Sequence, residues 1–160
     1  YRSAALNDKL SLQNQRFRNI AGLEEMKDVR VLWLHHNLID KCEGLSHLSN
    51  LRILYLQSNR ISSLRGLEDL AQLHTLNISM NLITSLEGII FLKNLTNLDV
   101  SHNSLSSTRD ITELQFLPNL TVLDMSSNRF EEEELISFLV ALPLLAVLSL
   151  KGNPLCKSVE

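Results

Sequence analysis

The fold depends on the stretch Leu51-Arg-Ile-Leu54-Tyr-Leu56-Gln-Ser-Asn59-Arg-Ile61, in which apolar residues and one asparagine keep a fixed spacing. The alternation around Leu54 and Leu56 has a period of two, which predicts a short strand with one buried face. The same spacing recurs on both sides of this stretch. The sequence is therefore a repeat, and the repeat must be interpreted before any single residue.

Six intact copies of the pattern follow one another in register. The first three steps between copies are 22 residues long and the last two are 25 residues long. A degenerate first copy surrounds Leu10 and Leu12, with Gln15 at the position where the others have asparagine. Terminal repeats are expected to be atypical because they also close the stack. The intact copies begin at Val29, Leu51, Leu73, Leu95, Leu120 and Leu145.

One such repeat cannot bury its own apolar face, so neighbouring repeats must stack and share a continuous core. We therefore expect an α/β fold, a right-handed leucine-rich-repeat solenoid or horseshoe, with a concave parallel β-sheet. The convex side should carry short 3₁₀ or single-turn segments. Longer helices have room at 111–117 and 131–142, with Glu131 to Glu134 in the first turn of the second one. We expect one domain over 1–160, with about seven repeats at 7–28, 29–50, 51–72, 73–94, 95–119, 120–144 and 145–160.

The asparagine at the ninth position of each repeat has a predicted structural role. It stands where the chain turns inward after the strand, and its amide can bond backbone groups that would otherwise be buried without partners. We expect a structural asparagine ladder made of Asn37, Asn59, Asn81, Asn103, Asn128 and Asn153.

Composition argues against several classes of function. The net charge of −3 and the lack of a basic cluster disfavour nucleic acid and anionic membranes as partners. No apolar run approaches the roughly 20 residues that cross a bilayer. Only two cysteines, Cys42 and Cys156, favour a reducing compartment, and Cys42 is expected to be a buried apolar residue. The chain begins at Tyr1 without a methionine, so we expect a fragment of a longer protein.

Nothing in the sequence indicates catalysis. There is no phosphate-binding loop, nucleophile elbow or HExxH motif. The histidines fall on different repeats and columns, and no cysteine or carboxylate completes a tetrahedral metal site with them. We therefore expect no enzyme activity, no metal and no cofactor.

The predicted concave face carries the candidate binding residues. Trp33 and Tyr55 share a column on neighbouring strands, and Trp, Tyr and Arg are the residue types most often found as interface hot spots. The alternative is that the two aromatics simply stack across the sheet and stabilise it. We favour contact with a partner, because a solvent-facing tryptophan requires a reason. The candidate binding residues are Arg30, Trp33, His35, His36, Arg52, Ile53, Tyr55, Gln57, Asn77, Asp99 and Asp124.

The 22-residue pattern resembles the intracellular leucine-rich-repeat subfamily typified by a regulatory subunit of protein phosphatase 1. Within that subfamily, four segments are similar to the leucine-rich-repeat dynein axonemal assembly factors. That family continues past Asn153-Pro154 into a C-terminal cap, so we expect the cap to be truncated or missing in this chain. The four segments are Tyr1-Arg2, Leu6-Asn7-Asp8-Lys9-Leu10, Gly22-Leu23-Glu24-Glu25 and Leu32-Trp33-Leu34.

The resemblance implies a non-catalytic scaffold for the cytoplasmic preassembly of axonemal dynein arms in ciliated or flagellated cells. It implies dynein subunits or other assembly factors as protein partners, a cytoplasmic location associated with the cilium or flagellum, and a monomer. Two alternatives remain open: an adaptor that regulates protein phosphatase 1, and an axonemal protein similar to a dynein light chain. The fold alone does not decide among them.

Overall fold

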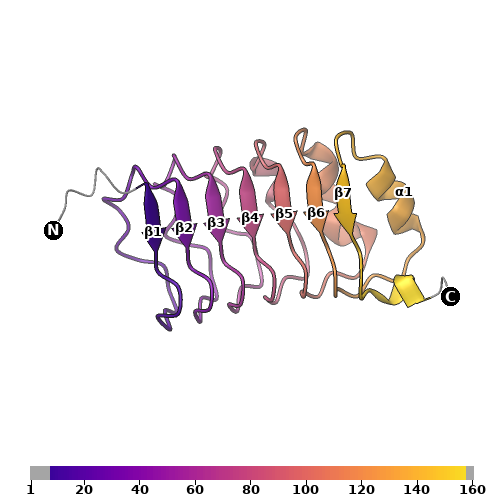
Figure 1. Ribbon diagram of the computed structural model, residues 1–160, viewed down its shortest axis with the longest axis horizontal. Helices are drawn as coiled ribbons and strands as arrows, with labels where there is room; N and C mark the ends of the chain where they lie inside the picture. Colours follow the sequence, from indigo (N-terminus) through magenta and orange to yellow (C-terminus); the bar gives the residue numbers. More distant parts are fainter. Residues whose placement is uncertain (1–7, 158–160) are drawn as a thin grey trace.

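A computed structural model describes residues 8–157 of the chain, so most of the predicted Tyr1 to Leu10 segment lies outside the described residues. Each repeat contributes one strand of three residues. The seven strands form a single parallel sheet in chain order, and neighbours pair in register (Figure 1). The strands are β1 (Lys9–Ser11), β2 (Val31–Trp33), β3 (Ile53–Tyr55), β4 (Thr75–Asn77), β5 (Asn97–Asp99), β6 (Val122–Asp124) and β7 (Val147–Ser149).

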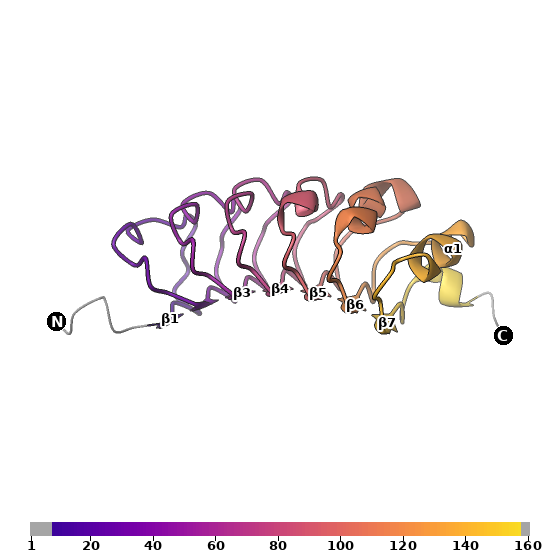
Figure 2. The ribbon, with the colours of Figure 1, turned by 90° about the horizontal axis from the view of Figure 1, so that it is seen from above.

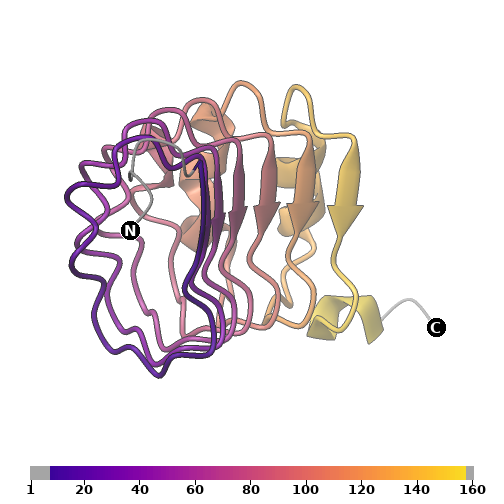
Figure 3. The same ribbon diagram turned by 60° about the vertical axis from the view of Figure 1, so that its left-hand side comes forward.

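The stack of coils is curved. Figure 2 shows the strands along the inner side of an arc and the return segments along its outer side. In Figure 3 the coils stand one behind another, with the strands side by side in one layer. The predicted solenoid with a concave parallel sheet is confirmed.

Apolar side chains from the first, fourth and sixth positions of each repeat fill the interior, as the spacing predicts. Leu51, Leu54 and Leu56 are fully buried, and their counterparts in the neighbouring repeats are buried as well. Full burial of one leucine contributes about 1.5–3 kcal/mol. The two ends differ from the middle: Leu10 is half-buried and Leu148 is 39% exposed, because each has a neighbouring coil on one side only within residues 8–157.

The outer side is less helical at its start than at its end. The return segments 22–26, 44–48 and 66–70 form isolated turns, such as the one closed by the Leu48 N–H and the Leu45 carbonyl at 2.9 Å. Helical structure begins later, with 3₁₀ helices η2 (Ile89–Phe91), η3 (Thr108–Phe116) and η4 (Pro154–Lys157) and one α-helix, α1 (Glu134–Val140). The α-helix is the only one within the described residues, and no helix there is long enough to cross a membrane.

The predicted helix over 131–142 is shorter than expected, and the placement of Glu131 to Glu134 in its first turn is wrong except for Glu134. The reason is a contact with the preceding coil. The Glu132 carboxylate accepts hydrogen bonds from the backbone N–H (3.2 Å) and the hydroxyl (3.3 Å) of Thr108. Glu132 is thereby tied to the preceding coil, and Glu133 occupies the N-cap position of the helix without a side-chain capping hydrogen bond.

The ninth-position asparagines link each coil to the one before it. The Asn103 side-chain oxygen accepts a hydrogen bond from the Ile83 N–H at 2.9 Å. Its NH₂ group donates to the carbonyls of Ile78 at 3.0 Å and Val100 at 3.1 Å. The same pattern holds at the other five positions of the ladder, which are Asn37, Asn59, Asn81, Asn128 and Asn153.

The residue directly before each ladder position has a left-handed backbone conformation. In the last copy this residue is Gly152, which adopts a positive φ without steric cost. The other copies place ordinary side chains in the same region, and Met80 and His102 have a φ of 52°. The full set is Asn14, His36, Ser58, Met80, His102, Ser127 and Gly152.

Candidate functional site

Two aromatic side chains lie next to each other on the concave face. Trp33 and Tyr55 are paired in register on β2 and β3, with ring centroids 6.1 Å apart and ring planes inclined by 8°. Both remain half-buried, so part of each residue still meets solvent. The cross-strand stacking given above as the alternative is therefore present, and the stacked pair is at the same time partly exposed, so contact with a partner stays a prediction.

Apolar and basic side chains border this pair. Val31 and Ile53 are half-buried on the same two strands, and Arg30 and Arg52 are exposed at the residues just before them. The Arg52 N–H donates to the Arg30 carbonyl at 2.8 Å, so the two arginines start from adjacent backbone. We call this group the aromatic patch; it consists of Arg30, Val31, Trp33, Arg52, Ile53 and Tyr55.

A column of polar side chains lies beyond the aromatic pair, at the seventh position of the repeat. Gln13, His35 and Gln57 each have a buried side-chain atom with no hydrogen-bond partner among residues 8–157. These atoms are Oε1 of both glutamines and Nδ1 of His35. Desolvation lowers the pKa of His35, and the neighbouring His36 lowers it further. His35 is thus favoured in its neutral form.

The concave face changes character from β4 onward. The Asp99 carboxylate accepts hydrogen bonds from the N–H (3.0 Å) and hydroxyl (2.7 Å) of Ser101, and from the Asn77 NH₂ group at 3.2 Å. Asn77 binds Ser79 in the same way, since a short acceptor two residues ahead of an N–H closes an Asx turn. We call this group the polar patch; it consists of Asn77, Ser79, Asp99, Ser101, Asp124 and Ser126.

A shallow hollow of about 270 Å³ joins the two patches. Tyr55 lines it at one end, and Asp99 and Asp124, which are paired in register, line it at the other. Within residues 8–157, no three histidine, cysteine or acidic side chains gather as metal ligands. The hollow therefore offers hydrogen-bond acceptors and an aromatic wall to a bound side chain.

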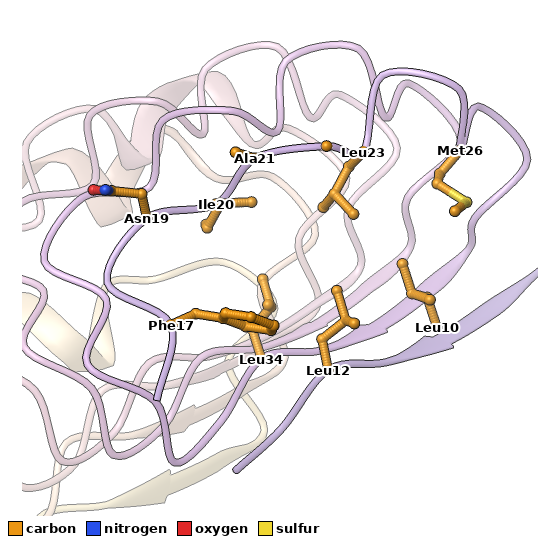
Figure 4. Close-up of a pocket in the computed structure, with 10 residues that line it drawn as sticks. Leu10, Leu12, Phe17, Asn19, Ile20, Ala21, Leu23, Met26 and Leu34 are labelled. Atoms are coloured by element: carbon orange, nitrogen blue, oxygen red, sulfur yellow. The ribbon is translucent and has the colours of Figure 1, made fainter. Parts of the chain in front are cut away.

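A second cavity, of about 390 Å³, lies at the N-terminal end of the core. Figure 4 shows its walls, with Leu10, Leu12 and Phe17 on one side and Ile20, Leu23 and Met26 on the other. The lining is apolar apart from Asn19, and it holds no acid, base or nucleophile. This cavity is the end of the apolar interior, and its chemistry supports packing.

The structure brings seven of the predicted binding residues into adjoining columns. Asn77 follows directly in the column of Tyr55, with which it is paired in register, and Asp99 and Asp124 lie one and two strands further on. Asn77, Asp99 and Asp124 lie in the polar patch, where their side-chain oxygens already accept from neighbouring serines, and the Asp99 carboxylate also accepts from the Asn77 NH₂ group. Gln13 was not among the predicted residues, although it shares the column of His35 and Gln57. The adjoining seven are Arg30, Trp33, His35, Arg52, Ile53, Tyr55 and Gln57.

His36 and Cys42 have other roles. His36 is exposed, has a φ of 55°, and packs edge-on against His35 at 5.3 Å between centroids. Cys42 is fully buried, and burial raises the pKa of its thiol to about 12, with a smaller contribution from Glu68. A thiol in that state is not a nucleophile near neutral pH.

Family models agree with this geometry. A model described as leucine-rich repeats in two copies matches residues 49–91, and one described as a leucine-rich repeat matches residues 71–130. Together they span about half of the chain. The chain belongs to the leucine-rich-repeat family, whose members are typically non-catalytic scaffolds that bind proteins. No curated protein matches the chain in sequence.

Solved structures share the fold. An internalin, inlF, from Listeria monocytogenes is 26% identical with a TM-score of 0.77, covering 86% of this chain and 39% of its own. Internalin C2 of the same organism is 28% identical with a TM-score of 0.78, covering 88% and 60%. A leucine-rich-repeat protein of Leptospira interrogans is 28% identical with a TM-score of 0.80, covering 90% and 37%. The chain thus spans less than two thirds of each of these structures.

Proposed function

We propose that this protein is a non-catalytic scaffold that binds a partner protein on its concave face and acts in the cytoplasmic preassembly of axonemal dynein arms. The observation that carries the binding function is the stacked, half-exposed Trp33–Tyr55 pair. A large aromatic surface on an uncovered sheet face gains free energy when a partner removes it from water.

The arrangement around the pair supports the same function. Aromatic, aliphatic and guanidinium groups lie in adjoining columns on two paired strands. The strands are held by the ladder and by the buried leucines, so the side chains start from a fixed backbone. A rigid arrangement of anchors loses little conformational entropy on binding, which favours affinity.

The role in dynein assembly rests on the resemblance of four short segments to the dynein assembly factors. Of these segments, Gly22 to Glu25 and Leu32 to Leu34 fall inside the described residues. Leu32 and Leu34 are core positions, whereas Trp33 lies on the face that a partner would meet. A location in the cytoplasm with association to the cilium or flagellum is part of the proposal.

The experiment that tests this function is purification of the tagged protein from a flagellated cell, with localisation in the same cells. We expect dynein subunits or other assembly factors to co-purify with it, and most of the protein to be in the cell body. Trp33→Ala with Tyr55→Ala should release those partners while the fold is kept.

The same experiment separates the two alternatives. Co-purification of phosphatase activity with the phosphatase 1 catalytic subunit would favour the phosphatase-regulating adaptor. Permanent residence in the axoneme would favour a light-chain-like component. Either result would overturn the assembly role and leave the scaffold function standing.

A further inference from the structure

The unpartnered atoms on the concave face are confined to one half of it. Gln13, His35 and Gln57 occupy the seventh position in the first three repeats. In the next three repeats the same position holds Ser79, Ser101 and Ser126, all of which are hydrogen-bonded. The fifth position differs in parallel. It holds Ser11, Trp33 and Tyr55 in the first half, whereas in the second half it holds Asn77, Asp99 and Asp124, which accept hydrogen bonds from the serines.

Leaving a polar group buried without a partner is unfavourable, because the group has lost its hydrogen bonds to water. Rotation about the side-chain torsions of Gln13 or Gln57 would turn the amide outward, where a bound N–H could reach it. A partner that supplies such donors would offset the cost. The free protein thus holds unsatisfied hydrogen-bonding capacity beside the stacked aromatic pair.

Charge is also divided between the halves. Arg30 and Arg52 stand exposed at one side of the aromatic pair. Asp99 and Asp124 stand in the polar patch, paired with each other across β5 and β6. A bound segment is attracted where its carboxylates lie over the two arginines. Further carboxylates over the polar patch would be repelled by Asp99 and Asp124.

We propose that the aromatic patch binds an acidic segment of a partner protein, with an apolar side chain of that segment packed on Trp33 and Tyr55. Carboxylates of the segment pair with Arg30 and Arg52, and its N–H groups donate to Gln13 and Gln57. The end of the segment that lies toward β5 and β6 is neutral or basic. This inference rests on the proposed scaffold function and adds the chemistry of the partner.

The first test is selection of random 12-residue peptides, displayed on phage, against the folded protein. We expect enrichment of sequences that combine Asp or Glu with a large apolar residue. Enrichment of basic peptides would overturn the inference, and so would selection of no binders. Binding of a 12-nucleotide single-stranded RNA as tightly as the best peptide would also overturn it, since arginines beside aromatics can stack bases too.

The second test measures affinity at the site itself. Trp33 is the only tryptophan of the chain, so its fluorescence reports directly on occupation of the aromatic patch. Titration with the best selected peptide should change this fluorescence. Arg30→Glu with Arg52→Glu should weaken binding by about tenfold to a hundredfold, because both attractive charges become repulsive.

The matched control makes the same charge change elsewhere. Arg60 and Arg65 are also exposed, but they follow the ladder residue Asn59 and lie outside the strands. Arg60→Glu with Arg65→Glu should leave the affinity within about twofold of the unmodified protein, since these exposed side chains lie outside the strands that carry the patch and their charges are screened by salt. Equal loss in both double variants would show a non-specific charge effect and would overturn the inference.

Failure of this inference is distinguishable from failure of the proposed function. If the selected peptides are basic or uncharged and their binding requires Trp33 and Tyr55, the acidic-segment inference is wrong and the proposed binding face still stands. If peptides and cellular partners bind equally well to the Trp33→Ala and Tyr55→Ala double variant, the proposed binding face is wrong as well. Circular dichroism of each variant establishes that its fold is intact.

Discussion

The two halves of the concave face share one backbone and differ in what their side chains do. On β2 and β3 the fifth position is aromatic, and His35 and Gln57 beside it each keep one buried side-chain atom without a partner within residues 8–157. On β4 to β6 it is Asn77, Asp99 and Asp124, and their oxygens bind the serines two residues on. One half therefore keeps its binding capacity for a partner, and the other uses it to stabilise the loops.

This difference shows that position in the repeat does not fix function. The repeat dictates that fifth-position side chains project from the sheet. Residue type then decides whether such a side chain bonds to the loop of its own coil or stays available to a partner. A short acceptor reaches its own backbone, whereas a large ring cannot. If the two halves are independent, a change in one should leave the other unaffected.

The largest effect is expected in the ladder, which both halves share. Asn103→Ala removes bonds to Ile83, Ile78 and Val100 and leaves several buried backbone groups unsatisfied. We expect a loss of about 3–5 kcal/mol of unfolding free energy. Urea denaturation followed by circular dichroism measures it.

Gln15 offers the control for that prediction. It occupies the ladder position of the first repeat, is exposed, and donates from its side chain to the Gln13 carbonyl at 3.1 Å. Gln15→Ala should cost less than about 1 kcal/mol. Similar losses of unfolding free energy in the two variants would mean that an interior ladder asparagine stabilises the fold no more than the terminal position does.

The second effect concerns binding. Trp33→Ala with Tyr55→Ala should weaken partner binding by about 2–4 kcal/mol, because it removes the exposed aromatic surface. Asn77→Ala with Asp124→Ala, in the other half, should change affinity much less. Calorimetric titration of the partner into each double variant compares them, and equal losses would abolish the division between the halves.

The third effect concerns stability within the polar patch. Asp99→Ala removes the acceptor for Ser101 and Asn77, so we expect a loss of about 1–2 kcal/mol. Asp99→Asn keeps an acceptor oxygen and should cost less than about 0.5 kcal/mol. Thermal unfolding of both variants distinguishes them; a larger loss in Asp99→Asn would mean that the charge, and not the turn, is what matters.

The smallest effect concerns chemical labelling of the two thiols in the protein without any substitution. Burial raises the pKa of Cys42 to about 12, so at pH 8 it stays protonated in the folded state, whereas Cys156 is exposed. A thiol-specific dye should label Cys156 rapidly and Cys42 only as fast as the second and third coils open. Rapid labelling of both thiols without denaturant would show that the half with the aromatic patch is not rigid.

Much of the fold could be predicted from spacing alone. Leu51, Leu54, Leu56 and Asn59 decide the coil, because burial of three side chains on one side leaves little freedom to the backbone between them. The same spacing also assigned Trp33 and Tyr55 to the concave face. Position in the repeat was sufficient for these residues, since it sets direction without reference to neighbours.

Other features depend on contacts between coils that no single repeat contains. The left-handed conformation before each ladder asparagine falls on Met80 and His102, residue types that do not signal it. The helix at Glu134 starts late because Glu132 is bound to Thr108 of the preceding coil. The unpartnered Oε1 of Gln13 becomes visible only in the folded structure, because it depends on which donors the neighbouring coil leaves near it.

The ladder also has a mechanical consequence. The Ile78 carbonyl accepts from both Asn81 and Asn103, and the Val100 carbonyl accepts from both Asn103 and Asn128, so successive rungs share their acceptors. An interior coil is thereby fastened on two sides and a terminal coil on one. Under a pulling force applied to the two ends, the molecule should peel from its extremities in steps of one coil, and its centre should be the last part to extend.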